Sequence, residues 1–161
     1  LRELRYESDK PRSLLGYGAS IMGMLKVGEK DKLKFQGVAG TGIAKYVEGA
    51  NGLNYDAIYN GTDELEELQT YGTYISYQHF WNYKMHSSIT AGWFGVDENR
   101  NLGPTDYQAG YYGSINIFFE PVKNFLFGWE ALAGERVNIN DDTGSSVRIQ
   151  MNATYKFNKQ Q

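Results

Sequence analysis

The sequence has no cysteine and few prolines. The absence of cysteine excludes several kinds of site, and the few prolines mark connections. With no Cys among 161 residues, the chain has no disulfide scaffold, no thiol nucleophile and no cysteine metal site. His79 and His86 are the only histidines, so we predict neither a metal site nor a cofactor. The three prolines, Pro11, Pro104 and Pro121, lie beside turn-forming or charged residues and mark predicted connections.

Long apolar runs and an excess of positive charge are also missing. No apolar run reaches the about 20 residues that a transmembrane helix needs. The net charge of −3 lacks the basic footprint of nucleic-acid-binding proteins, so no nucleic-acid partner is expected. The chain begins at Leu1 with neither a Met nor an apolar signal segment, and we expect it to be processed or truncated.

Glycine and aromatic residues are abundant, and the apolar residues alternate with polar ones. The chain has 19 Gly, 13 Tyr, 8 Phe and 3 Trp, a composition that favours β-structure. In residues 148–157 every second side chain is apolar, and residues 84–93 repeat this pattern. A period of two predicts strands. The one candidate helical turn is residues 63–66, where Asp63 is a potential N-cap.

This alternation predicts eight strands whose connections differ in length. The strands span approximately residues 1–8, 13–27, 31–46, 67–81, 83–97, 105–120, 124–137 and 145–158. Tight turns are expected at 28–31, 81–83 and 120–123, and longer polar loops at 47–66, 97–104 and 138–144. Short turns at one end and long loops at the other are typical of outer-membrane barrels. We predict an all-β, antiparallel, up-and-down transmembrane β-barrel forming one domain over residues 1–161, with 47–66 as its longest extracellular loop.

Aromatic side chains are spaced like the two girdles of a membrane barrel. Tyr83 and Trp93 share an apolar face ten residues apart. At about 3.3 Å per residue and a tilt of about 40°, they are roughly 25 Å apart along the barrel axis, the height of a lipid-facing band. The other predicted girdle residues are Phe125, Phe127, Trp129, Tyr155 and Phe157.

The polar faces of the predicted strands carry mostly basic side chains, whereas most acidic residues lie in connections. Unpaired charges in a dry interior cost several kcal/mol each, so these faces must contact water. A hydrated lumen lined by Lys and Arg favours anionic solutes. The predicted pore-lining residues are Lys34, Lys84, Glu130, Arg136 and Arg148.

Three stretches carry a family resemblance: residues 37–46, residues 77–88 and residues 121–136. They resemble the C-terminal half of the DcaP-like outer-membrane porins. The resemblance implies a bacterial outer-membrane barrel, a homotrimer in contact with the lipid bilayer and lipopolysaccharide, that passes small hydrophilic solutes, often anionic ones. Where the family usually carries Arg-Ser, this chain has His86 and Ser87.

The number of strands leaves two architectures open. Eight strands close to an interior just filled by side chains, whereas open channels need about sixteen. A complete chain would form a small plugged barrel. Family chains are longer, so as one half of a porin this chain would instead line part of a wider pore.

Two further functions remain as alternatives to a non-enzymatic porin. The first is a soluble eight-stranded, lipocalin-like barrel with its apolar face inward around a ligand. The second is a small outer-membrane lipid hydrolase. It would use His86 and Ser88, which share one strand face, and it would need an acidic partner and an oxyanion donor.

Overall fold

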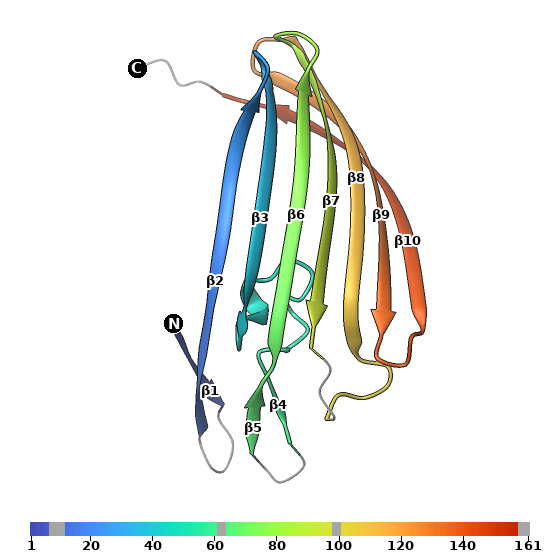
Figure 1. Cartoon of the computed structure of the whole chain (residues 1–161). Coiled ribbons are helices and arrows are strands. Elements are labelled where there is room, and N and C mark those ends of the chain that lie inside the picture. Colours follow the sequence, from blue (N-terminus) through green and yellow to red (C-terminus); the bar gives the residue numbers. More distant parts are fainter. Residues whose placement is uncertain (7–11, 61–63, 98–100, 158–161) are drawn as a thin grey trace.

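A computed structural model of the protein, which describes residues 1–6, 12–60, 64–97 and 101–157, is an antiparallel sheet bent into an open half-barrel (Figure 1). Over these residues the sheet has eight strands, each paired with the next one in the chain. The strands are β1 (Arg2–Tyr6), β2 (Arg12–Val27), β3 (Asp31–Thr41), β6 (Gln69–Phe80), β7 (Met85–Val96), β8 (Tyr107–Val122), β9 (Phe125–Asn138) and β10 (Thr143–Tyr155). They confirm the predicted all-β, antiparallel class and the eight predicted strands.

The two longest connections lie at one end of the sheet, as predicted, but the longer loop predicted at 138–144 is wrong, because only residues 139–142 join β9 to β10. The turns at 28–30, 81–84 and 123–124 lie together at what we call the turn end (Figure 1). The connections 42–68, 97–106 and 139–142 lie at the loop end. The longest of them contains the 3-10 helix η1 (Ala44–Tyr46) and a hairpin of β4 (Ala57–Tyr59) and β5 (Leu65–Glu67).

Two predictions for the longest loop are wrong, one strand end and one helical turn. The strand predicted over 31–46 ends at Thr41, because Gly42 takes a left-handed φ of 67° and turns the chain into η1. The helical turn predicted at 63–66 is replaced by β5, which pairs with β4. One isolated helical turn has a high nucleation cost, and the hairpin satisfies the backbone instead. Asp63 itself lies outside the described residues.

Proline marks a connection less strictly than predicted. Pro104 lies in the loop 97–106, and Pro11 lies outside the described residues. Pro121 lies within β8, where the register with β9 shifts between Phe119 and Val122. A β-bulge tolerates the missing backbone N–H of proline. The tight turn therefore falls after the predicted strand end, at Asn124, whose φ is 70°.

The strand register separates the side chains onto two faces. One cross-strand row contains Tyr77, Ile89, Ile115, Ala131 and Ile149, and the adjacent row on the opposite face contains Ser76, Thr90, Ser114, Leu132 and Arg148. Large apolar side chains of the first face are exposed: Ile89 and Ile115 at 59% and Ile149 at 76%. We call this the outer face, and the opposite, concave one the inner face.

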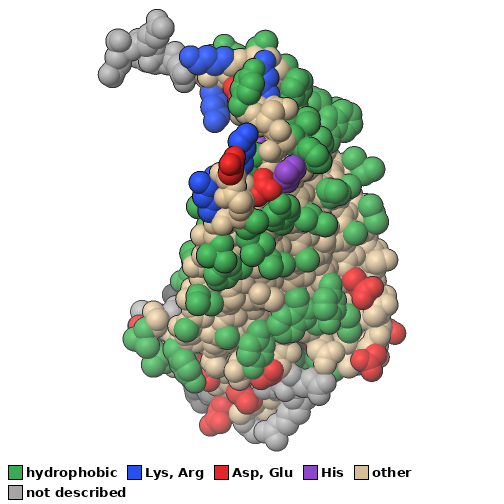
Figure 2. Space-filling view, turned by 45° about the horizontal axis from the view of Figure 1, so that its top comes forward, with side chains coloured by type: hydrophobic (Ala, Val, Ile, Leu, Met, Phe, Trp, Pro, Cys, Tyr) green, Lys and Arg blue, Asp and Glu red, His purple; other side chains and the backbone are tan. Residues whose placement is uncertain are grey.

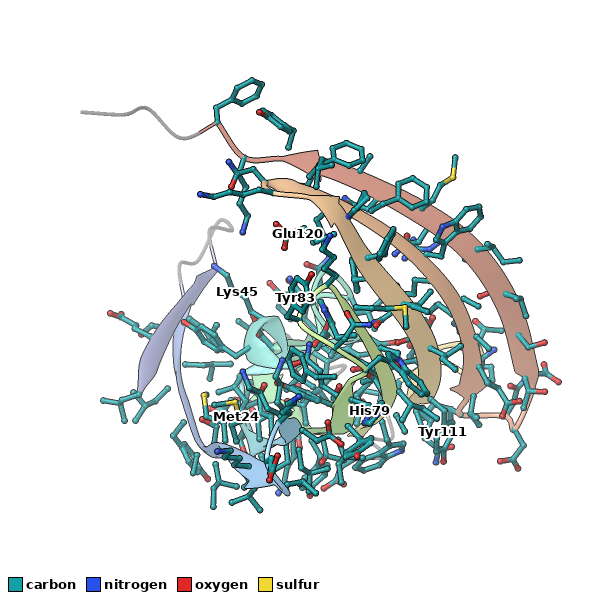
Figure 3. The ribbon with its side chains drawn as sticks, turned by 90° about the horizontal axis from the view of Figure 1, so that it is seen from above. Met24, Lys45, His79, Tyr83, Tyr111 and Glu120 are labelled. Carbon is teal, nitrogen blue, oxygen red and sulfur yellow. The ribbon has the colours of Figure 1, made fainter. Side chains whose placement is uncertain are left out.

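Over the part of the chain that the structure describes, the buried core lies at the loop end. A segment of the longest loop, residues 43–53, packs against the inner face, and we call it the inner segment. Its Ala44, Val47 and Ala50 form a buried cluster with Phe94 of β7. Figure 3 looks along the sheet and places this part of the chain, with Lys45, inside the curve of the strands. Among the described residues no helix is long and apolar enough to cross a membrane.

Candidate solute pathway on the inner face

The middle of the inner face is polar and hydrogen-bonded across strands. The Asn116 amide donates to Glu130 Oε2 at 3.3 Å, and the Gln150 amide donates to Glu130 Oε1 at 2.7 Å. The Ser76 and Thr90 hydroxyls are 2.8 Å apart on the neighbouring row. Side chains of this kind are compatible with a water-filled lumen.

Three of the five predicted pore-lining residues lie on the central part of this face. Lys34 lies on β3 and pairs in register with Ser76 and Met24. Glu130 lies on β9 between Asn116 and Gln150. The exposed side chain of Arg148 lies on the inner face of β10, two residues from Gln150 and in the adjacent inner-face row.

The other two predicted residues lie at opposite ends. Arg136 is at the loop end, where its Nε donates to Asn138 Oδ1 at 2.5 Å and its Nη2 donates to the Thr105 carbonyl at 2.6 Å. Its guanidinium lies 3.7 Å from the Tyr107 ring centroid. Lys84 is in the turn before β7, with Nζ 3.3 Å from the Pro121 carbonyl oxygen. The five predicted residues are therefore spread along the face, and Arg136 also holds the end of the loop at Thr105.

The predicted girdle residues occupy the outer face at both ends. Trp93 is toward the loop end of β7, and Phe125, Phe127 and Trp129 are at the turn end of β9. Phe127 and Trp129 make an edge-on contact with centroids 5.6 Å apart, and Tyr155 and Phe157 make another at 4.8 Å. Tyr83 is 90% exposed in the turn before β7 rather than in the strand.

A polar cluster at the turn end of the outer face was not predicted. Asp31 accepts hydrogen bonds from the Tyr77 hydroxyl, from His79 Nδ1 at 2.8 Å and from the Phe80 backbone N–H at 3.0 Å. The Trp81 ring packs edge-on against His79, with centroids 4.4 Å apart. The signal in the sequence was the i, i+2 spacing of Tyr77, His79 and Trp81, which places three amphipathic rings on one strand face.

Figure 2 shows how side chains gather on one side of the molecule. Hydrophobic side chains spread over the sheet between its two ends, and Lys and Arg gather at the turn end. The outward apolar face is the opposite of what the soluble, lipocalin-like alternative requires, because that alternative needs the apolar face inside.

The alternative catalytic pair lies on the inner face in an aromatic setting. The His86 ring stacks on Phe118 at 5.2 Å and packs at 5.4 Å against Phe80. The backbone N–H of Ser88 donates to Asn116 Oδ1 at 3.0 Å. Over the residues that the structure describes, His86 has no hydrogen bond to an acidic side chain, so the third member of a hydrolytic triad is not in place.

The inner segment covers part of the inner face at the loop end. This placement was also not predicted. Val47 is fully buried over Gly72, where an added Cβ would meet a Val47 methyl at 2.7 Å. Tyr55 lies just after the inner segment, and its hydroxyl accepts a hydrogen bond from the Tyr107 N–H at 2.7 Å. Burial raises the pKa of Tyr55, which keeps this phenol neutral. The sequence signal was Ile43, Val47 and Leu53, apolar residues inside a polar loop.

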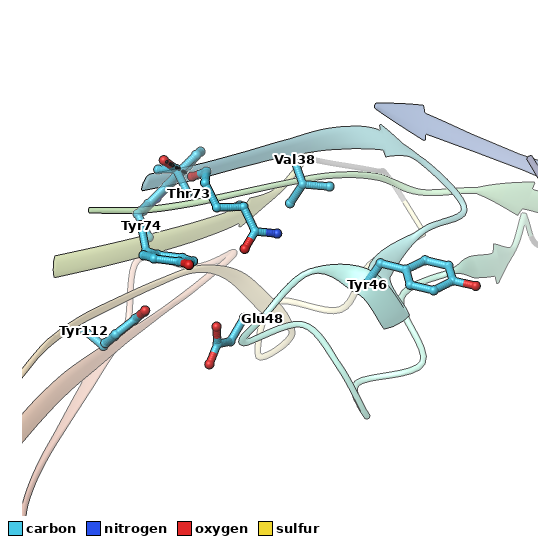
Figure 4. A pocket seen from close by; sticks show the side chains of 9 residues that line it. Val38, Tyr46, Glu48, Thr73, Tyr74 and Tyr112 are labelled. Carbon is cyan, nitrogen blue, oxygen red and sulfur yellow. Dashed lines mark hydrogen bonds between the residues drawn. The ribbon is translucent and has the colours of Figure 1, made fainter. Parts of the chain in front are cut away.

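The carboxylate of Glu48 projects from the inner segment toward the wall of the sheet. It lines a pocket with Gln36 of β3, Tyr74 of β6 and Tyr112 of β8 (Figure 4). Within the described part of the chain, no hydrogen bond or salt bridge holds this carboxylate. Likewise, no group of three or more potential metal ligands is present among the described residues.

A curved antiparallel sheet with an apolar outer face, a polar inner face and an inward-folded loop has the fold of a porin-type β-barrel wall. The solved structure of the outer membrane channel DcaP of Acinetobacter baumannii is similar to it, with a TM-score of 0.76 at 18% sequence identity. The match covers 92% of this chain and 42% of that chain, so this chain spans less than half of the channel's length. No protein-family model and no curated protein sequence matches the chain. The structural likeness confirms, at the level of fold, the resemblance found in the sequence.

Proposed function

We propose that this chain forms part of the wall of a bacterial outer-membrane porin that passes small hydrophilic solutes by passive diffusion. The observation that carries the proposal is the inverted polarity of the sheet, with exposed Ile89, Ile115 and Ile149 outside and hydrogen-bonded polar side chains inside. In a membrane barrel lipid faces the first set and water the second. The likeness to the DcaP channel supports the same function. No chemistry is performed in this function.

The barrel of this porin needs more strands than the described residues supply. Among the strands that the structure describes, none pairs with the far edge of β10 or with the edge of β2 over residues 17–27. A lipid-exposed sheet edge does not occur in the hydrocarbon layer. We propose that further strands pair with both edges to give a pore wider than eight strands, and that such barrels assemble as homotrimers, with lipopolysaccharide around the loop end.

Basic side chains give the proposed pore a preference for anions toward its turn end. Lys26, Lys32 and Lys34 lie on the inner face of β2 and β3, and Arg148 lies on β10. Grouped positive charges raise the local concentration of anions. Lys34 and Arg148, on one cross-strand row, are the strongest candidates for this effect.

The test is single-channel recording in a planar bilayer with the 161-residue chain refolded in detergent. We expect open-channel steps whose reversal potential in a salt gradient indicates anion preference. Lys34→Gln and Arg148→Gln should each reduce that preference, and the control Lys30→Gln, in the turn between β2 and β3, should leave it unchanged. A folded protein without conductance would contradict pore formation by this chain. Equal selectivity in all variants would contradict the lining assignment.

A further inference from the structure

The inner segment is built so that one carboxylate projects into the proposed lumen. On one side of Glu48, Val47 is fully buried against the wall at Gly72. On the other side, Gly49 takes a φ of 93° and seats on Phe94, where an added Cβ would meet the ring at 2.4 Å. Both neighbours are therefore fixed, and Glu48 between them is exposed. The chain holds this side chain at a defined place on the pathway.

The wall opposite Glu48 supplies two phenols. Tyr74 and Tyr112 lie on either side of Gly92 in one cross-strand row of the inner face. The Tyr112 ring lies over Gly92, where an added Cβ would meet its Cε1 at 2.1 Å. Figure 4 shows the hydroxyl ends of both tyrosines on the side of the pocket that Glu48 faces. The pocket thus offers a carboxylate and two phenol oxygens as hydrogen-bond acceptors.

A positive charge also lines the adjoining hollow. Glu48 and Arg136 line this second hollow together with Phe94, Tyr107 and Tyr112. Arg136 is held there by Asn138, Thr105 and the Tyr107 ring. A negative and a positive group therefore line the same hollow.

We propose that Glu48, Tyr74 and Tyr112 form a subsite for a primary ammonium group, and that the pore passes small amino-carboxylates whose acid group faces Arg136. An ammonium group has three donors and no acceptor, which matches the acceptors of the pocket. A carboxylate suits the planar fork of an arginine. This inference rests on the proposed function and names its solute class.

The test uses the refolded full chain and β-alanine as the probe. Binding to the protein in detergent micelles is measured by saturation-transfer NMR, with propionate, which lacks the ammonium group, as the matched ligand. Glu48→Gln should weaken β-alanine binding about threefold, the size of an exposed ion pair, and leave propionate unchanged. Tyr112→Phe should weaken β-alanine binding by a smaller factor. Glu29→Gln, in the turn between β2 and β3, is the matched control and should have no effect.

A second readout separates this inference from the proposed function. Liposome swelling compares β-alanine with erythritol, a neutral solute of similar size, and we expect Glu48→Gln to lower the ratio of the two rates. If erythritol does not enter, the porin function fails, while Glu48-dependent binding still supports the subsite. Unchanged β-alanine binding in folded Glu48→Gln, or an equal loss for propionate, would overturn the subsite.

Discussion

The outer and inner faces of this sheet are built from the same strands but depend on different surroundings. On the outer face, Ile89, Ile115 and Ile149 are exposed and have neighbours of the same kind. A continuous apolar surface of this type marks a contact with lipid or protein. On the inner face, Ser76 and Thr90 bond to each other. The buried core is small and lies at the loop end over the described residues, so in the proposed porin the bilayer takes the place of most of a hydrophobic core.

The largest effect is expected from a charge placed on the wrong face. Ile115→Arg should cost about 2–4 kcal/mol of unfolding free energy in a bilayer, because the position is midway between the aromatic ends of β8. The neighbouring Ser114→Arg points to the inner face and should cost less than about 1 kcal/mol. Denaturant unfolding in lipid vesicles measures both. Equal costs would contradict the assignment of the two faces.

The second prediction tests a place where the inner face is buried. Val47→Ala removes two methyl groups from a fully buried site and should cost about 2 kcal/mol locally. We expect limited proteolysis within residues 43–53 to accelerate while the heat-modifiable gel shift of the sheet stays the same. Lys45→Ala, at an exposed position of the same segment, is the control. Global unfolding of Val47→Ala would show that the inner segment supports the entire sheet.

The third prediction compares two arginines of the inner face. Arg136→Lys should lose about 1–1.5 kcal/mol, because an ammonium cannot reproduce the bonds to Asn138 and Thr105 together with stacking on Tyr107. Arg148→Lys should change stability little, since Arg148 is exposed. Thermal unfolding in detergent measures the difference. A larger loss for Arg148→Lys would mean that Arg148 has the structural role.

The smallest effect is expected at the turn end of the outer face. Trp81 Nε1 donates to the Ser87 hydroxyl at 3.0 Å, so Trp81→Phe should cost about 0.5–1 kcal/mol. Tyr83→Phe, at a position 90% exposed, is the control and should have no measurable effect. Tryptophan emission and unfolding in vesicles check both variants. An equal loss for Tyr83→Phe would show that the loss at Trp81 does not come from its bond to Ser87.

The strands were predictable because each uses a local pattern, and the inner segment was not because its contacts are distant in sequence. Alternation over residues 84–93 and 148–157 identifies β7 and β10 without any knowledge of their neighbours. The packing of Val47 on Gly72 joins residues that nothing local connects. Arg136 was predicted as a lining residue from its face alone, and its contacts with Thr105 and Tyr107 depend on a loop that alternation does not place.

The strand order of the sheet also sets how the molecule can assemble. The strands of the large sheet pair in chain order, with β3 next to β6. The intervening β4 and β5 form a separate hairpin within one loop. The connections between paired strands are therefore short, except for the connection 42–68. The strands can add to the sheet in chain order, because each new strand offers its free edge to the next one. Over the described residues the second edge of β10 has no partner strand, so this edge can act as the template for a further strand.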